Sequence, residues 1–165
     1  MIKDDLVELF CSNVVRAGAR AKRVTDTDGL RDTVSELVRG AGSVYCPCVT
    51  EMEKVLTISP QTLVADYLKA ETTVEEVAAG IAETGTVVCL SSSGKALQAG
   101  VVTSHHVAIV SRERIFADLD EFFAWMGGLP PTNITFITGP SRTGDIEQTL
   151  SVGVHGPGRL DVIIC

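Results

Sequence analysis

Short, almost continuously apolar runs of β-prone residues recur along the chain and alternate with segments of helical spacing. The clearest runs cover residues 86–90, 106–110, 134–137 and 160–164. Their apolar residues do not alternate with polar ones, which is the pattern of strands buried on both faces of a sheet. Helices packed on both faces of a mainly parallel sheet provide such burial, so the sequence predicts an α/β fold with that architecture.

Three segments carry apolar residues at the spacing of one helix face, and glycines follow each of them. These segments cover residues 6–17, 30–38 and 119–126. Asp26 or Thr27 is expected to cap the second helix, because their short polar side chains accept hydrogen bonds from the first helical N–H groups.

Two Thr-x-x-Glu patterns are typical of capping boxes and predict short helical turns, one at Thr50–Glu53 and one at Thr73–Glu76. Residues 62–65 are expected to form a short strand. Residues 78–82 and 86–90 flank a tight connection, which predicts a β-hairpin.

The length and charge of the chain narrow the class of protein. Its 165 residues suit one domain, covering residues 1–165, with a sizeable core. The net charge of −7 disfavours non-specific binding to nucleic acid or to an anionic membrane. No apolar run approaches the roughly 18 residues of a membrane span, and acidic residues near the N-terminus exclude a signal peptide there. We therefore expect a cytoplasmic protein without a membrane span and without a nucleic-acid partner.

The cysteines and histidines give no complete set of metal ligands by spacing. The five cysteines are Cys11, Cys46, Cys48, Cys89 and Cys165. The only close pair is Cys-Pro-Cys, which lacks the usual Cys-x-x-Cys spacing; buried, inert thiols are favoured over a redox or metal role. His105 and His106 open a strand and should face opposite ways, and we expect no acidic partner near them. The expectation is that the chain has no metal site.

The segment from Gly139 to Glu147 is the best candidate for an anion site. It follows an apolar strand, and Ser141 or Thr143 could cap a short helix over residues 144–150 whose dipole favours a negative group. Arg142 could grip a carboxylate or phosphate with two parallel hydrogen bonds. Asp145 and Glu147 could equally complement the helix dipole themselves, so the pattern leaves both alternatives open.

Two further polar positions are candidates for chemistry. His155 lies in the glycine-rich stretch 153–158, where it could fasten a turn or act in acid–base chemistry. Glu83 stands between two apolar runs, either on a solvent-facing turn or in a cleft, where desolvation would raise its pKa toward that of a general base. The glycines of the stretch are expected to permit a tight turn and close approach of the backbone to a strand or ligand.

Three stretches together resemble the LUD-domain family, the lactate utilization protein C group. They are Ala-Glu-Thr-Gly-Thr at residues 82–86, His-Val-Ala-Ile-Val at 106–110, and residues 138–157 with Gly-Pro-Ser-Arg-Thr-Gly-Asp-Ile-Glu and Gly-Val-His-Gly-Pro. The resemblance covers residues 75–164 well. It implies the fold shared by sugar-phosphate isomerases, coenzyme A transferases and formyltetrahydrofolate cyclo-ligases, with the site at loops past the strand ends.

The resemblance also implies a function, as a subunit or accessory protein in the oxidation of L-lactate to pyruvate beside iron–sulfur proteins. This chain lacks clustered cysteines, so electron transfer would belong to those partners. We expect its loops to bind a small carboxylate, nucleotide or phosphorylated ligand, while the cofactor stays open. The expected ligand-binding residues are Thr84, Gly85, Thr86, Gly139, Ser141, Arg142, Thr143 and Gly156.

The alternative is a stand-alone enzyme of the isomerase, transferase or cyclo-ligase type. Glu83 would then be the base or nucleophile and Arg142 the anion clamp, with His155 or Asp145 carrying a proton. Whether these side chains meet in space is a question for the structure.

Overall fold

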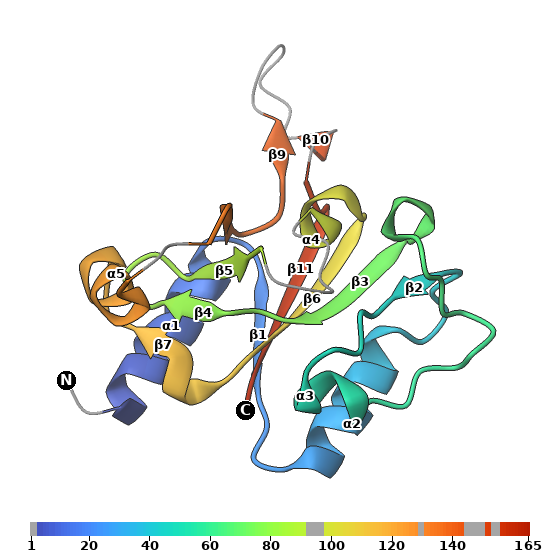
Figure 1. The fold of residues 1–165 in the computed structure, drawn as a ribbon, viewed down its shortest axis with the longest axis horizontal. Helices are drawn as coiled ribbons and strands as arrows, with labels where there is room; N and C mark the ends of the chain where they lie inside the picture. The colour runs from blue at the N-terminus through green and yellow to red at the C-terminus, as the bar shows by residue number, and fades with distance from the viewer. Residues whose placement is uncertain (1–2, 92–97, 129–130, 144–150, 153–155) are drawn as a thin grey trace.

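Two β-sheets form the framework of the computed structural model, which describes residues 3–91, 98–128, 131–143, 151–152 and 156–165 (Figure 1). The larger sheet has five strands, all parallel. Their order across the sheet is β1 (Arg20–Arg23), β11 (Arg159–Ile164), β6 (His105–Val110), β3 (Thr72–Glu76) and β2 (Val44–Tyr45). The predicted mainly parallel sheet is confirmed, and its central strand β6 is buried along its whole length.

The second sheet has four strands and is mostly antiparallel, an arrangement that the sequence analysis did not anticipate. Its order is β7 (Ile115–Phe116), β4 (Ala79–Ile81), β5 (Thr86–Leu90) and β8 (Ile134–Thr138). Strands β4 and β5 form the predicted hairpin, and β8 pairs with the other edge of β5. A separate two-stranded ribbon joins β9 (Arg142–Thr143) to β10 (Ser151–Val152).

One extended segment belongs to both sheets in turn, since β3 runs directly into β4 (Figure 1). The N–H of Val77 donates to the carbonyl of Ile109 in the parallel sheet. The N–H of the next residue, Ala78, donates to the carbonyl of Val88 in the second sheet. The chain therefore passes from one sheet to the other between two consecutive residues.

The three predicted long helices are α1 (Lys3–Arg16), α2 (Thr27–Leu37) and α5 (Leu119–Met126). Asp26 caps α2, because its side chain accepts from the N–H of Gly29. The short helices are α3 (Glu51–Lys54) and α4 (Ala99–Val102), with 3-10 turns η1 (Tyr67–Lys69) and η2 (Arg112–Arg114). The capping box at Thr50–Glu53 is present in full. Within the described part of the chain, no helix has the length and apolar character that a bilayer crossing requires.

The helices cover both faces of the parallel sheet, as predicted. On one face α1 and the second sheet enclose an apolar core that includes Phe10, Val14, Ala108, Val162 and Cys89. On the other face α2 packs Leu30 and Val34 against Val74, Val107, Ile109 and Ile163. Helix α5 covers the outer face of the second sheet through Phe122, which contacts the cluster of Ala79, Ile81, Val88 and Phe116.

Two predicted elements are wrong. The Thr-x-x-Glu pattern at Thr73–Glu76 does not cap a helical turn; it lies inside strand β3, where four of the five residues are buried. Residues 62–65 do not form a strand either, because only Leu63 pairs, in a single bridge to Val44.

Candidate functional site

A surface pocket lies where strand β8 ends and the chain continues through residues 139–141. Its volume is about 580 Å³, which is within the range of small-molecule sites. Residues from four separate parts of the chain line it. They are Arg16, Ala17, Val101, Thr135, Phe136, Ile137, Thr138, Gly139, Pro140, Ser141, Gly156 and Pro157. Three of the predicted ligand-binding residues, Gly139, Ser141 and Gly156, thus share one pocket.

Close backbone contacts hold this wall together. Gly139 has a φ of +70°, and a Cβ there would collide with the carbonyl oxygen of Ala17 at the end of α1. The N–H of Ser141 donates to the carbonyl of Pro157 at 2.8 Å. A Cβ on Gly156 would lie 3.0 Å from the Cβ of Ser141. The glycine-rich stretch therefore makes the predicted close backbone approach, and its partner is the segment that follows β8.

A row of threonine hydroxyls connects the pocket to the turn of the β4–β5 hairpin. The hydroxyl of Thr138, in the pocket wall, lies 2.7 Å from that of Thr86, which lies 2.6 Å from that of Thr84. Gly85, between them, has a φ of +69° and packs against the backbone of Val14. Residues 84–86 do not line the pocket themselves. Thr86 contacts the hydroxyl of Thr138 directly, and Thr84 contacts Thr86.

Arg16 contributes a cation to the pocket that the sequence analysis missed. It lies in the last turn of α1, is exposed, and lines the pocket beside Ala17. A basic residue in the last turn of a helix complements the negative end of the helix dipole. The sequence position of Arg16 is explained by this role, so it gives no sign of a ligand site. With the hydroxyls of Thr135, Thr138 and Ser141, its guanidinium gives the pocket the groups that bind a small carboxylate.

The other predicted site residues lie elsewhere or outside the described residues. Glu83 is exposed on the hairpin turn, where its N–H donates to the carbonyl of Ala117 and its own carbonyl accepts from the side-chain amide of Asn13. It does not line the pocket. Of the two alternatives weighed for Glu83, the solvent-facing turn is therefore the one observed.

Strand β9 directly follows Ser141, one of the two residues considered as a cap for the expected helix 144–150. Arg142 pairs with Val152 and Thr143 with Ser151 in the ribbon of β9 and β10, so Ser141 does not cap a helix. Extended backbone pairs its N–H groups with the neighbouring strand and does not aim them at an anion. Asp145, His155 and the proposed helix 144–150 lie outside the described residues, as do the side chains of Arg142 and Thr143, so their roles stay predictions.

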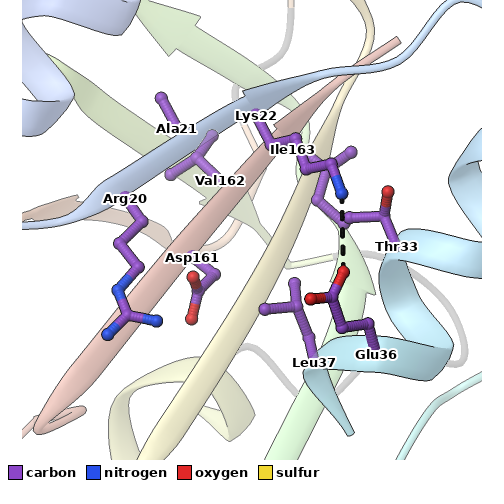
Figure 2. Close-up of a pocket in the computed structure, with 9 residues that line it drawn as sticks. All are labelled: Arg20, Ala21, Lys22, Thr33, Glu36, Leu37, Asp161, Val162 and Ile163. Atoms are coloured by element: carbon purple, nitrogen blue, oxygen red, sulfur yellow. Dashed lines mark ion pairs between the residues drawn. The ribbon is translucent and has the colours of Figure 1, made fainter.

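A second hollow, of about 260 Å³, lies between α2 and the edge of the parallel sheet (Figure 2). Lys22 and Glu36 face each other there, with 3.6 Å between their charged groups. Asp161 of β11 is also in its wall. The carboxylate of Asp161 is almost fully buried and accepts hydrogen bonds from His105 at 2.8 Å and from Arg159 at 2.6 Å.

The surroundings of Asp161 shift its ionisation. Burial by itself would raise the pKa of Asp161, but the hydrogen bonds from His105 and Arg159 outweigh burial and hold the pKa below its ordinary value. Asp161 therefore stays ionised wherever the fold is intact near neutral pH. Because His105 and Arg159 both hydrogen-bond a buried carboxylate within the sheet, a structural role explains this trio.

The two adjacent histidines face opposite ways, as predicted, and each meets a carboxylate that is distant in sequence. His105 pairs with Asp161, whereas Nε2 of His106 lies 3.2 Å from Oε1 of Glu75. Neither acid is a sequence neighbour of its histidine; parallel strand pairing brings them together. The expectation that no acidic partner lies nearby is therefore wrong in space.

The thiols at the carboxyl ends of the parallel strands are poorly ionised. Burial, with a smaller contribution from Cys48, raises the pKa of Cys46 to about 12. Burial raises the pKa of Cys165 to about 11. The Sγ atoms of Cys46 and Cys48 are 3.5 Å apart. A weakly ionised thiol is a poor nucleophile, which agrees with the predicted inert thiols at Cys46 and Cys165.

The fold and the glycine-lined pocket define an α/β protein with a ligand-sized site at a strand end. The LUD domain family model matches residues 59–165, and the chain therefore belongs to the LUD-domain family. The predicted resemblance is confirmed. The matched residues include the whole pocket wall except Arg16 and Ala17.

The chain is similar to several curated proteins named lactate utilization protein C. Lactate utilization protein C of Geobacillus sp. (strain WCH70) is 38% identical over 90 residues, which are 51% of this chain and 37% of that protein. Lactate utilization protein C of Halalkalibacterium halodurans is 37% identical over 90 residues, 51% of this chain and 39% of that protein. The match thus covers well under half the length of these relatives.

A solved structure agrees with the whole fold. The crystal structure of a DUF162 family protein from Deinococcus radiodurans superposes with a TM-score of 0.77 and covers 99% of this chain and 98% of its own. The two sequences are 20% identical, so the likeness concerns the fold alone.

Proposed function

We propose that the chain acts in lactate utilization, as a subunit or accessory protein of a system that oxidises L-lactate to pyruvate. We further propose that the pocket beside β8 binds a small carboxylate of this kind. One observation carries the proposal: a ligand-sized pocket with an arginine and three hydroxyls lies largely inside the segment that matches the LUD family. The name shared by the curated relatives supplies the metabolic context.

The groups in the pocket suit a 2-hydroxy or 2-oxo acid. A guanidinium can pair with a carboxylate through two parallel N–H donors, and Arg16 is the charged side chain among the lining residues. Hydroxyl groups both donate and accept, so Thr135 and Ser141 can meet either the hydroxyl of lactate or the carbonyl of pyruvate. Apolar contact from Val101 and Phe136 suits the methyl group that both acids carry.

The redox step itself is assigned to partner proteins. Conversion of lactate to pyruvate releases two electrons and two protons, and the electrons need an acceptor. The spacing of the five cysteines does not match an iron–sulfur ligand pattern. We therefore propose iron–sulfur subunits as the partners of this chain.

Thermal unfolding with and without candidate ligands tests the pocket. L-lactate or pyruvate at one hundred times its dissociation constant should add about 2.7 kcal/mol, which raises the melting temperature of a domain of this size by about 5–10 °C. Arg16→Gln should abolish the shift. Arg39→Gln is the matched control, since Arg39 is also exposed and follows the end of a helix but lines a different hollow.

The outcome can contradict the proposal in two ways. A carboxylate shift that persists in Arg16→Gln would remove Arg16 from the site. A shift produced by ATP, coenzyme A or phosphate, with none from lactate, pyruvate or acetate, would replace the carboxylate with a phosphorylated ligand.

The metabolic role has its own test in the native host. Deletion of the gene should abolish growth on L-lactate as the carbon source, and restoring the chain should recover it. The tagged chain should co-purify with iron-containing proteins. Normal lactate oxidation in the deletion strain would refute the role without bearing on ligand binding.

A further inference from the structure

Three side chains of types that bind metal ions in proteins converge in the buried interior between the two sheets. Glu75 comes from β3 and His106 from β6 of the parallel sheet, and Cys89 comes from β5 of the second sheet. Their ligand atoms all lie within 4.8 Å of one another. The exposed fractions are 3% for Glu75, 4% for Cys89 and 0% for His106, so bulk solvent does not reach this group of polar atoms.

One distance matches the edge of a coordination tetrahedron, and a second is longer by about 0.4 Å. Zinc binds nitrogen and oxygen at about 2.0–2.1 Å and sulfur at about 2.3 Å, which sets the N···O edge at about 3.3 Å and the S···O edge at about 3.5 Å. Here Nε2 of His106 is 3.2 Å from Oε1 of Glu75, and Sγ of Cys89 is 3.9 Å from the same oxygen. Small side-chain adjustments would bring all three atoms to bonding distance from one central ion.

The imidazole of His106 is the strongest sign of an ion. Neither ring nitrogen makes a hydrogen bond to any described residue, although the ring is fully buried. Burying such a polar group without a partner is unfavourable by an amount comparable to a lost hydrogen bond. Thr73 lies opposite His106 in the register of β3 and β6. Its buried hydroxyl likewise makes no hydrogen bond to any described residue. A cation at Nε2 would satisfy the nitrogen that now approaches Glu75 without hydrogen-bond geometry.

The fold also fixes the orientation of this ring. Helix α4 passes directly over His106 at Gly100, where a Cβ would lie 2.6 Å from Nδ1 and 2.8 Å from Nε2. Only a residue without a side chain lets the helix approach so closely. The imidazole is therefore held in place by backbone on one side and is directed toward Glu75 on the other.

We propose that Glu75, Cys89 and His106 supply three ligands of a buried site for one zinc ion that joins the two sheets. A mixed set of sulfur, nitrogen and oxygen ligands suits Zn²⁺. The charges also balance, because the carboxylate and the thiolate together neutralise the two positive charges of the ion. Since the site lies in the interior, the ion enters during folding, and binding is coupled to folding.

Refolding with defined metal tests this site without any activity assay. The full chain is unfolded in denaturant with a chelator, freed of chelator, and refolded with or without zinc chloride. After gel filtration, elemental analysis should find about one zinc per chain. With zinc at one hundred times its dissociation constant, the melting temperature should rise by about 5–10 °C.

Matched variants assign the ligands. His106→Gln and Cys89→Ala should each lose the zinc, whereas His105→Gln should keep it, because His105 is the adjacent buried histidine that faces the opposite side of the sheet. Refolding with Co²⁺ gives an independent readout, since a cobalt–thiolate bond produces a charge-transfer absorption band. That band should be present in the wild-type chain and in Cys46→Ala, and absent from Cys89→Ala.

Each failure overturns the proposal. Wild-type protein that refolds with neither zinc nor a cobalt–thiolate band has no such site. A band that survives in Cys89→Ala and disappears in Cys46→Ala would place the metal at the Cys46–Cys48 pair instead. Where His106→Gln does not fold, the wild-type cobalt spectrum and the near-isosteric variant Cys89→Ser decide the question alone.

Discussion

Replacing Gly100 with alanine isolates the contact between helix α4 and the imidazole of His106. In a helix, Gly→Ala normally stabilises by up to about 1 kcal/mol. Here the added methyl would lie 2.6 Å from Nδ1 of His106, about 0.8 Å closer than ordinary van der Waals contact begins. Forcing extra volume into a packed interior costs about 1–3 kcal/mol. We therefore expect Gly100→Ala to destabilise the protein by about 1–2 kcal/mol, lowering the melting temperature by about 2–8 °C.

The assay is urea unfolding of this variant beside Gly29→Ala. Gly29 also lies in a helix, but a Cβ there meets only the side chains of Asp26 and Val24, at 3.3 Å or more. That substitution should leave stability unchanged or raise it. The strain of Gly100→Ala should be relieved in a background where His106 is alanine, so the two changes should be non-additive.

The sign of the effect decides whether the reasoning holds. Equal stabilisation by Gly100→Ala and Gly29→Ala would show that the ring does not lie against the helix backbone. Strict additivity with His106→Ala would show that the cost arises elsewhere.

Three further outcomes follow from the contacts described. The pKa of Asp161 is lower in the folded protein than its ordinary value of 3.8, so its carboxylate stabilises the fold at any pH above 3.8. This stabilisation is lost as the pH falls through the lower folded pKa. The difference in unfolding free energy between wild type and Asp161→Asn, measured by urea unfolding, should therefore disappear in acid. The pKa of Cys46 is about 12 in the folded protein, so little reactive thiolate is present at pH 8. Cys46 should therefore react with iodoacetamide far more slowly in the native protein than in the unfolded chain, as followed by mass spectrometry. Equal rates in the two states would contradict its burial. Gly139→Ala should cost about 2–4 kcal/mol in thermal unfolding, because left-handed backbone adds about 1–2 kcal/mol to the clash with Ala17; a loss below 1 kcal/mol would contradict this packing.

Local patterns predicted the elements well wherever a residue's neighbours in sequence are also its neighbours in space. The capping box at Thr50–Glu53 formed because its hydrogen bonds lie within one turn. The same pattern at Thr73–Glu76 failed because β3 pairs with β2 on one side and β6 on the other. Strand partners distant in sequence override a local preference, and the β-branched residues Thr72, Thr73 and Val74 agree with that outcome.

The site was predictable only in part, for the same reason. Gly139, Ser141 and Gly156 were found because glycine-rich segments after a strand mark close backbone approach. Arg16 was not found, because nothing in a helix of ordinary pattern indicates that its end meets β8, more than a hundred residues later. The pairing of His106 with Glu75 depends on strand register, which the sequence does not specify.

The passage of one strand between two sheets, at Val77 and Ala78, has a mechanical consequence. The N–H groups of adjacent residues bond to different sheets, so at this crossing the two sheets are joined without a flexible linker. A pull on either layer is transmitted along the extended backbone to the other, and prying them open requires breaking ladder bonds on both sides of the crossing. Any adjustment of the molecule to its ligand or partners should therefore fall on the loops around the pocket, with the two layers moving as one rigid piece.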